Sequence, residues 1–311
     1  MTQFAFFFPG QGSQSVGMMN GFADNPVIKQ TFVEASDILG EDFWSMATEP
    51  NEMLKITQHT QPLMLAAGIA TWRAYLQAGG KQPSIFAGHS LGEYAALVAA
   101  DAISYADALP LVKYRAQVMQ SAVPEGVGAM AAILGLDDET VRAVCLEAAQ
   151  GEVCEAVNLN SPGQVVIAGN KAAVERGMEI AKQKGAKRAL PLPVSVPSHC
   201  ALMQPAAEKL AAYLADVAVQ IPQTPVIHNA DVAIYNNAAE IKHALVRQLY
   251  SPVRWVETVQ AIYAKGIINS AECGPGKVLT GLTKRIIAEL PCVALVSNEA
   301  ISEFVNSHQQ P

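Results

Sequence analysis

Short apolar runs alternate with longer helical segments along most of this chain, and that alternation is the strongest constraint on its fold. The predicted strands are Phe4–Phe8, Ser84–Ala87, Val226–Asn229, Ile267–Glu272 and Val293–Ser297. The predicted helices are Asn25–Leu39, Gln61–Leu76, Glu93–Ala100, Ser104–Ser121, Leu202–Leu214, Glu240–Leu249, Trp255–Lys265 and Val278–Glu289. Because helices connect successive strands, the sheet should be largely parallel and covered by helices on both faces. The sequence therefore predicts an α/β fold.

The pattern changes between residues 126 and 197. The elements predicted there are, in order, the strand Gly128–Leu134, the helix Asp137–Ala149, the strands Glu152–Asn158 and Val165–Ala168, the helix Lys171–Lys184 and the strand Ala186–Leu192. This βαββαβ order is that of the ferredoxin-like unit. Prolines bound the segment on both sides. We therefore expect a small ferredoxin-like domain at 126–197, inserted into a large domain made of residues 1–125 and 198–311.

The composition excludes several functional classes. Half of the 311 residues are hydrophobic and 16% are charged, which is typical of a globular enzyme. A net charge of −7 argues against nucleic acid as a main partner, because phosphate binding requires a basic surface. No apolar run approaches the roughly 18 residues of a membrane helix, so no membrane interaction is expected. The five cysteines form no C-x-x-C pair, which predicts a cytoplasmic protein without disulfides or a metal site.

The pentapeptide Gly88-His89-Ser90-Leu91-Gly92 matches the G-x-S-x-G pattern and stands between a predicted strand and a predicted helix. Flanking glycines permit the sharp turn that exposes a serine nucleophile above a sheet. The N-terminus of the following helix offers N–H groups and a positive dipole end to a developing oxyanion. These features predict an α/β-hydrolase-like large domain with Ser90 as its nucleophile. The alternative is a glycine-rich turn in which the serine only caps the helix.

A serine nucleophile needs a general base, and the chain has six histidines. His199 lies where the chain leaves the predicted small domain, which would place it at a cleft between domains, where ligands commonly bind. His228 is the second candidate, with an ordinary structural histidine as its alternative reading. His89 adjoins Ser90 but should point elsewhere at a sharp turn, and His308 lies in a predicted polar tail.

Arg115 lies on the apolar stripe of its predicted helix, in line with Leu111, Val118 and Ala122 at helical spacing. A guanidinium that points the same way as an apolar stripe needs an anion or a set of acceptors. One possibility is an internal salt bridge. The other is a substrate carboxylate, bound by the bidentate guanidinium fork.

Seven short motifs extend along nearly the whole chain. They are Phe7–Gln14 (FFPGQGSQ), Gly88–Tyr94 (GHSLGEY), Tyr114–Ala116 with Met119-Gln120, Asn158–Pro162 (NLNSP), Val194–His199 (VSVPSH), Gln248-Leu249 before Pro252–Trp255 (PVRW), and Glu272–Gly276 (ECGPG). Together and in this order they resemble the malonyl-CoA:acyl-carrier-protein transacylases and the related acyltransferase domains of polyketide and fatty-acid synthases.

The resemblance implies catalytic roles for five positions. Ser90 would carry the malonyl group as an ester, and His199 would act first as general base and then as acid. A backbone carbonyl at Gln248, rather than an aspartate, would orient the histidine. Backbone N–H groups of Gln11 and Leu91 would form the oxyanion hole.

The resemblance also implies substrate contacts. Arg115 would bind the malonyl carboxylate, and Asn160 would line the cleft. Leu91 is similar to the residue found in malonyl-selective members. Ser198 stands where malonyl-selective synthase domains commonly have phenylalanine, and it would leave more room there.

The reaction implied by the resemblance moves a malonyl group from malonyl-CoA to the pantetheine thiol of acyl carrier protein, in fatty-acid biosynthesis. Coenzyme A enters as part of the substrate, no cofactor is expected, and the protein should be a monomer. Because the carrier is acidic, its docking surface should be basic. The candidates are Lys182, Lys184, Lys187, Arg188, Lys277, Lys284 and Arg285.

Two other functions fit parts of the pattern. A serine hydrolase such as a thioesterase or lipase shares G-x-S-x-G and would pass the acyl group to water instead of a thiol. A carrier-binding subunit with an inactive site would keep the fold without the chemistry, although Ser90, His199 and Arg115 are all present.

Overall fold

The computed structural model describes residues 3–22, 24–194 and 196–309, and its main sheet, sheet A, has five strands. These strands are β1 (Ala5–Phe8), β2 (Ile85–Gly88), β7 (Val226–Ile227), β8 (Ser270–Glu272) and β9 (Cys292–Ala294). Their order across the sheet is β7-β2-β1-β8-β9, and every neighbouring pair is parallel. The predicted largely parallel sheet is confirmed.

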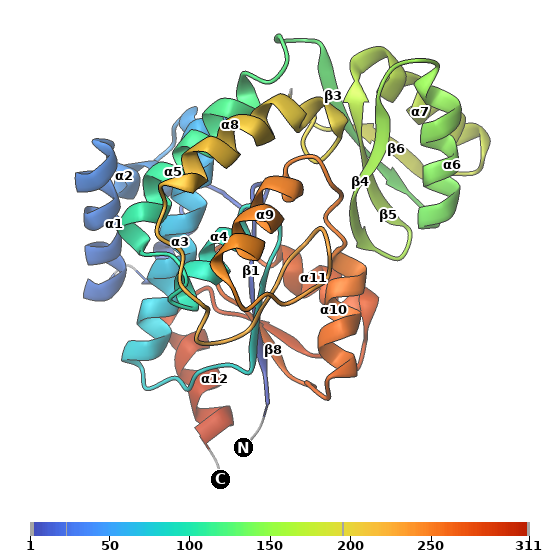
Figure 1. The fold of residues 1–311 in the computed structure, drawn as a ribbon. Helices are drawn as coiled ribbons and strands as arrows, with labels where there is room; N and C mark the ends of the chain where they lie inside the picture. Colours follow the sequence, from blue (N-terminus) through green and yellow to red (C-terminus); the bar gives the residue numbers. More distant parts are fainter. Residues whose placement is uncertain (1–2, 23, 195, 310–311) are drawn as a thin grey trace.

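Helices cover both faces of sheet A (Figure 1). They are α1 (Pro26–Leu39), α2 (Phe43–Thr48), α3 (Thr57–Gln77), α4 (Gly92–Ala99), α5 (Tyr105–Gln120), α8 (Gln204–Ala215), α9 (Ala238–Gln248), α10 (Trp255–Ala264), α11 (Val278–Ile286) and α12 (Asn298–Gln309), with short 3-10 turns at Asn20–Phe22, Met53–Lys55 and Ala201–Met203. None of the described helices is both long and apolar enough to cross a membrane.

The core has two hydrophobic clusters on opposite faces of sheet A, and strand β1 contributes side chains to both. Phe6 and Phe8 belong to the larger cluster, with side chains of α1, α3, α4 and α5. Ala5 and Phe7 belong to the smaller cluster, with side chains of α10 and α11. Because successive side chains of a strand point to opposite faces, this four-residue strand contributes to both halves of the core.

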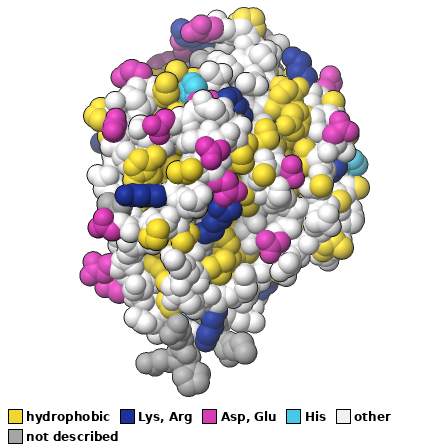
Figure 2. Space-filling view, turned by 90° about the vertical axis from the view of Figure 1, so that its left-hand side faces the viewer, with side chains coloured by type: hydrophobic (Ala, Val, Ile, Leu, Met, Phe, Trp, Pro, Cys, Tyr) yellow, Lys and Arg dark blue, Asp and Glu magenta, His cyan; other side chains and the backbone are white. Residues whose placement is uncertain are grey.

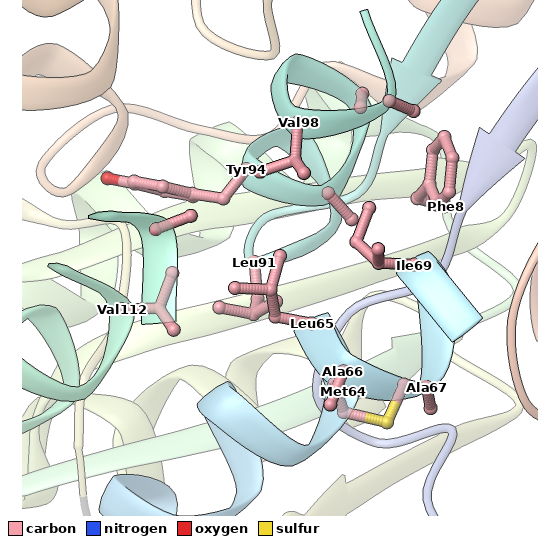
Figure 3. Close-up of a cluster of buried hydrophobic side chains, with 14 of the residues drawn as sticks. Phe8, Met64, Leu65, Ala66, Ala67, Ile69, Leu91, Tyr94, Val98 and Val112 are labelled. Carbon is pink, nitrogen blue, oxygen red and sulfur yellow. The ribbon is translucent and has the colours of Figure 1, made fainter. Parts of the chain in front are cut away.

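Helix α4 is buried along its whole length and packs against α3 and β1. Figure 3 shows Leu91, which precedes α4, in one buried cluster with Leu65 of α3. Gly68 permits the close approach of α3, since a Cβ atom there would lie 3.3 Å from the Phe8 ring and 3.5 Å from Cβ of Ala95. This packing fixes the start of α4, where the predicted nucleophile stands.

A second sheet, sheet B, has four strands: β3 (Gly128–Leu134), β4 (Cys154–Ser161), β5 (Gln164–Asn170) and β6 (Arg188–Pro191). Their order is β4-β5-β3-β6, and every neighbouring pair is antiparallel. Helices α6 (Asp138–Ala149) and α7 (Lys171–Gln183) share a hydrophobic cluster with this sheet. The βαββαβ order and the strand order confirm the predicted ferredoxin-like unit. The boundaries at 126 and 197 stay a prediction.

Sheet B is joined to the rest of the molecule along β4. The backbone N–H of Leu159 donates to the carbonyl oxygen of Val253 at 3.0 Å. The backbone N–H of Val253 donates to the carbonyl oxygen of Val157 at 2.8 Å. Helices α10 and α11 also pack against β4. This strand therefore holds its end, with Asn160, against the sheet A part of the fold.

The prediction of a polar tail around His308 is wrong, because that segment forms α12. Phe304 is buried, its ring packs edge-on to Phe4 at a centroid distance of 5.6 Å, and it stacks on His308 at 4.1 Å. Apolar residues are few in α12, so their helical spacing is a weak signal without the sheet that covers them. The short helix α2 is also absent from the prediction, since six residues are too few to show a period.

The variant Phe304→Ala should lower the free energy of unfolding by about 3 kcal/mol, because it empties a buried site between α12 and β1. Urea unfolding followed by circular dichroism measures this difference. The neighbouring exposed Glu303 supplies a control, Glu303→Ala, for which a change below about 0.5 kcal/mol is expected. Equal small effects in both variants would show that α12 does not belong to the core.

Candidate active site

Ser90 lies in a sharp turn between β2 and α4, the serine turn (residues 88–92). Its φ is 52°, in the left-handed region that residues other than glycine rarely adopt. A Cβ atom at Gly88 would lie 1.9 Å from the carbonyl oxygen of Gly92, and one at Gly92 would lie 2.0 Å from that of Phe8. Only glycines fit these two positions, so the serine turn holds Ser90 at the carboxyl end of the parallel sheet, the place of a nucleophile in this kind of fold.

His199 is hydrogen-bonded to Ser90, with 2.8 Å between Nε2 and Oγ. Its Nδ1 lies 2.7 Å from the backbone carbonyl oxygen of Gln248. Because a carbonyl oxygen only accepts, Nδ1 carries the proton and Nε2 accepts from the serine hydroxyl. The other candidate base, His228, is instead buried with its Nδ1 2.7 Å from Oε1 of Glu93. The fold therefore brings His199, and not His228, to the serine.

The surroundings of His199 favour its neutral form. Burial first, and then the positive charge of Arg115, lower its pKa from 6.5 to about 3, although the hydrogen bond to the Gln248 carbonyl acts in the opposite direction. At neutral pH the imidazole is therefore uncharged, and its Nε2 carries a free lone pair toward Ser90. The same low pKa means that an imidazolium formed during a reaction would release its proton readily.

Arg115 is buried on α5, and its guanidinium reaches the serine. Nη2 lies 3.3 Å from Ser90 Oγ and 2.8 Å from the side-chain oxygen of Gln248, while Nη1 donates to the side-chain oxygen of Gln61 at 2.6 Å. In the described part of the chain, Nε has no partner and no carboxylate pairs with this guanidinium. A buried cation with neutral partners is suited to receive an anion. The internal salt bridge, left open by the sequence, does not occur there.

The turn that follows β1 lies directly against the serine turn. The backbone N–H of His89 donates to the carbonyl oxygen of Phe8 at 2.9 Å, and a Cβ atom at Gly10 would lie 2.4 Å from the carbonyl oxygen of His89. Gln11 is the next residue, so its backbone comes close to the serine turn. No described residue accepts a hydrogen bond from the backbone N–H of Gln11 or Leu91. Two unengaged N–H groups beside the serine are what an oxyanion hole requires.

Asn160 connects sheet B to the serine turn. Its side-chain oxygen, at the end of β4, lies 2.8 Å from Nε2 of His89. The His89 ring also packs near Trp255, with 5.5 Å between the ring centroids. His89 therefore turns away from its neighbour Ser90, as the sharp turn predicts, and binds across to sheet B.

The profile of the acyl transferase domain family matches residues 5–298. The chain belongs to this acyl transferase family. It is 57% identical to the malonyl CoA-acyl carrier protein transacylase of Salmonella typhimurium, over 97% of this chain and 98% of that protein. It is 43% identical to the protein of the same name from Bacillus subtilis, over 97% of this chain and 96% of that one.

Solved structures of the acyl transferase family share the whole fold. An acyl-carrier-protein S-malonyltransferase from Burkholderia pseudomallei is 59% identical, with a TM-score of 0.97 over 98% of this chain and 100% of the other. A malonyl-transacylase in complex with a type II polyketide synthase acyl-carrier protein is 53% identical, with a TM-score of 0.97 over 99% and 100% of the two chains. The parallel sheet and the ferredoxin-like unit are thus features of this family. In the Val194–His199 motif, Ser195 lies outside the described residues.

Three buried polar residues of this acyl transferase site carry no predicted role. They are Gln61, Glu93 and Asn229. Glu93 is fully buried and accepts hydrogen bonds from the backbone N–H of Asn229 at 2.8 Å and from the side chain of Gln248 at 3.1 Å. A signal for Glu93 exists in the sequence, since it is the one charged residue of the apolar helix α4. Asn229 gives no such signal, because its contacts depend on how β7 pairs with β2.

The low pKa of His199 predicts a pH dependence of stability. As the pH falls below 6.5, the unfolded chain binds a proton that the folded protein does not bind until about pH 3, so the folded state loses stability over that range. His199→Asn removes this proton site, and asparagine tolerates the left-handed φ of 66° found there. Between about pH 6 and pH 4, the wild type should lose about 1 kcal/mol more per pH unit than the variant.

Urea unfolding of both proteins across this pH range measures the difference in slope. The histidines other than His199 are common to both proteins and cancel in the comparison. Parallel stability curves would show that the folded protein does not hold His199 in its neutral form.

Proposed function

We propose that this chain is an [acyl-carrier-protein] S-malonyltransferase. It transfers a malonyl group from malonyl-CoA to the pantetheine thiol of acyl carrier protein in fatty-acid biosynthesis. The supporting observation is the buried guanidinium of Arg115, 3.3 Å from a serine that is hydrogen-bonded to a neutral histidine. A nucleophile beside a carboxylate-binding cation fits an acyl thioester whose acyl group also carries a free carboxylate. The names of the relatives reported above describe the same reaction.

The first half-reaction forms a malonyl ester on Ser90. The serine Oγ attacks the thioester carbonyl carbon of malonyl-CoA while Nε2 of His199 takes its proton. The tetrahedral oxyanion is stabilised by the backbone N–H groups of Gln11 and Leu91, and such a donor typically contributes about 3 kcal/mol. Collapse of the intermediate breaks the C–S bond, and the coenzyme A thiolate leaves with the proton from His199.

The second half-reaction is the same sequence in reverse. The pantetheine thiol of the carrier gives its proton to Nε2 of His199, and the thiolate attacks the carbonyl carbon of the malonyl ester. The C–O bond breaks, and Ser90 recovers its proton from His199. Malonyl-carrier leaves, so the two acyl acceptors bind in turn to one site, which is a ping-pong mechanism.

We assign the malonyl carboxylate to one edge of the Arg115 guanidinium. Gln61 accepts from Nη1 and Gln248 accepts from Nη2 at 2.8 Å, whereas Nε has no partner in the described part of the chain and Nη2 also faces Ser90 Oγ at 3.3 Å. Nε and Nη2 form a fork that matches the two oxygens of a carboxylate. A carboxylate bound there lies one short carbon chain away from the ester carbonyl.

Asn160 has a supporting part in this proposal. By holding His89 at 2.8 Å it fixes the residue before the nucleophile and ties the end of β4 to the serine turn. We assign Asn160 to the sheet B side of the acyl site on this contact.

The two alternative functions account for less of the site. A thioesterase or lipase that acts on neutral acyl groups does not need the buried cation of Arg115 beside its nucleophile. A carrier-binding subunit with an inactive site does not need the 2.8 Å hydrogen bond between Ser90 and His199. The acyl transfer reaction uses all three residues.

The structure favours one end of sheet B for carrier docking. In the sheet, Arg188 of β6 is paired with Leu134 of β3, which is also paired with Gln164 of β5. The Gln164 side chain accepts a hydrogen bond from Arg285 of α11 at 2.6 Å. Basic residues from sheet B and from α11 therefore lie along one end of the sheet, the end to which Asn160 also belongs.

Other basic residues are less suited to an acidic partner. Lys182 and Lys184 pair with Glu179 at 2.7 Å and Glu147 at 3.2 Å, which offsets their charge. On the face formed by α1 and α2, Figure 2 shows acidic and basic side chains interspersed. We therefore assign the acidic carrier to the sheet B end.

The proposed reaction needs no cofactor, because each bond change is made by side chains and by the thioester that is itself the substrate. All five cysteines are free thiols. We place the protein in the cytoplasm, where thiols stay reduced and carrier-based synthesis has its substrates.

Initial rates with malonyl-CoA and carrier protein as varied substrates test the proposed function. Double-reciprocal plots should give parallel lines, because the first product leaves before the second substrate binds. The variant Ser90→Ala should lose at least about 10³-fold in kcat, since it has no nucleophile. Intersecting lines, or a Ser90→Ala variant with near wild-type activity, would contradict the covalent mechanism.

The variant Arg115→Ala should lose the preference for malonyl-CoA over acetyl-CoA. Without the fork, kcat/KM for malonyl-CoA should fall by about 10²-fold or more, whereas acetyl-CoA, which has no carboxylate, should change by less than about threefold. Arg115→Lys is the matched control, because it keeps the charge and loses the fork. Its kcat/KM for malonyl-CoA should lie between those of the wild type and Arg115→Ala. An unchanged ratio of the two substrates in Arg115→Ala would remove Arg115 from the substrate site.

A further inference from the structure

The side chain of Asn229 binds two backbone groups that lead into the nucleophile. Its side-chain oxygen accepts a hydrogen bond from the backbone N–H of Ser90 at 2.7 Å, and its side-chain nitrogen donates to the carbonyl oxygen of Gly88 at 2.6 Å. Asn229 itself is fully buried, two residues after the end of β7. One amide thus bridges the backbone of Gly88 and Ser90.

The serine turn needs such a restraint. The left-handed φ of 52° at Ser90 is disfavoured for a residue with a Cβ atom, and it persists only where the surroundings fix it. The side-chain nitrogen of Gln248 donates to the carbonyl oxygen of Ser90 at 2.9 Å, so both backbone polar groups of the nucleophile are bound by side chains. These two side chains come from the segment after β7 and from the end of α9, both far from β2 in the sequence.

The buried carboxylate of Glu93 is hydrogen-bonded to both Asn229 and Gln248. Oε2 of Glu93 accepts from the backbone N–H of Asn229 at 2.8 Å and from the side-chain nitrogen of Gln248 at 3.1 Å. Oε1 of Glu93 accepts from Nδ1 of His228 at 2.7 Å. With three donors, the carboxylate is satisfied inside the core, and it ties the end of β7 to the end of α9 directly beneath the serine.

We propose that Asn229 is a positioning residue for acyl transfer: it holds the Ser90 backbone in its left-handed conformation and thereby aims Oγ at Nε2 of His199. Glu93 anchors Asn229 and Gln248 in the arrangement that does this. Asn229 has no contact with the reacting atoms, so it acts through the serine turn alone. The inference rests on the proposed function, in which Ser90 is the nucleophile.

The direct test is the variant Asn229→Ala, with the rate of Ser90 labelling by a fluorophosphonate as the readout. Fluorophosphonates react with activated serines regardless of acyl specificity, so labelling reports the alignment of Ser90 and His199. A displaced nucleophile typically costs up to about 10²-fold in rate, and we expect labelling to slow by about 10- to 100-fold. The kcat for malonyl transfer should fall to a similar extent, whereas KM for malonyl-CoA should change by less than about threefold, since Arg115 is intact.

Asn25→Ala is the matched control. Asn25 caps α1 through its side chain, so its loss destabilises the protein without touching the serine turn. This variant should label and turn over like the wild type at temperatures where it is folded. If Asn229→Ala also labels at the wild-type rate while folded, the positioning role is wrong. The role is equally wrong if its rate falls only in proportion to the folded fraction, as measured by circular dichroism.

Glu93→Gln keeps the test decisive if Asn229→Ala does not fold. Glutamine has the shape of glutamate and can keep one oxygen toward Asn229 and Gln248, but it no longer offers an anionic acceptor. We expect a smaller loss, about 3- to 30-fold in labelling rate, with KM for malonyl-CoA again nearly unchanged. Wild-type labelling in Glu93→Gln would overturn the anchoring role.

The same experiment separates this inference from the proposed function. A wild type that labels rapidly, forms no malonyl ester and outpaces Asn229→Ala would refute the malonyl substrate and keep the positioning role. If instead the wild type forms the malonyl ester and folded Asn229→Ala forms it at the same rate, the positioning role is refuted and the proposed function stands.

Discussion

The hydrogen bond from Nδ1 of His199 to the backbone carbonyl oxygen of Gln248 is the interaction on which the site depends. It sets the tautomer, so that Nε2 can accept the Ser90 proton. A neutral carbonyl stabilises an imidazolium less than a carboxylate does, and with burial it leaves the pKa of His199 at about 3. Such an imidazolium is a stronger acid than a thiol, so it can protonate the coenzyme A thiolate as that group leaves.

The side chain of Gln248 balances the two buried charges of the site. Its amide oxygen accepts from Arg115 at 2.8 Å, and its amide nitrogen donates to Glu93 at 3.1 Å. These contacts fix the amide orientation, because a flipped amide would oppose both charges. Arg115 keeps an unpaired Nε in the described part of the chain, so the cation still has room for one anion, the carboxylate of the substrate. Gln248 therefore orients His199 through its backbone carbonyl and orients the Arg115 guanidinium through its side chain.

Local patterns in the sequence were enough to predict the serine turn and the βαββαβ unit, since each depends on residues close together in the chain. The position of His199 at the predicted domain junction ranked it above His228, but its contact with Ser90 could not be derived locally, because the two residues are 109 apart in the chain. The part played by Asn229 could not be predicted, since its contacts exist only once β7 pairs with β2. Helix α12 was missed for a related reason: Ile301, Phe304 and Val305 form only one short apolar stripe in a polar segment, and its partners Phe4 and Phe6 lie at the other end of the chain.

Intact-protein mass spectrometry after mixing the protein with malonyl-CoA, and then with acyl carrier protein, tests the central claim most directly. We expect one added malonyl mass on the wild type, none on Ser90→Ala, and transfer of that mass to the carrier when the carrier is added. An adduct that disappears into water without reaching the carrier would indicate a hydrolase. The absence of any adduct in folded protein would contradict malonyl transfer through Ser90.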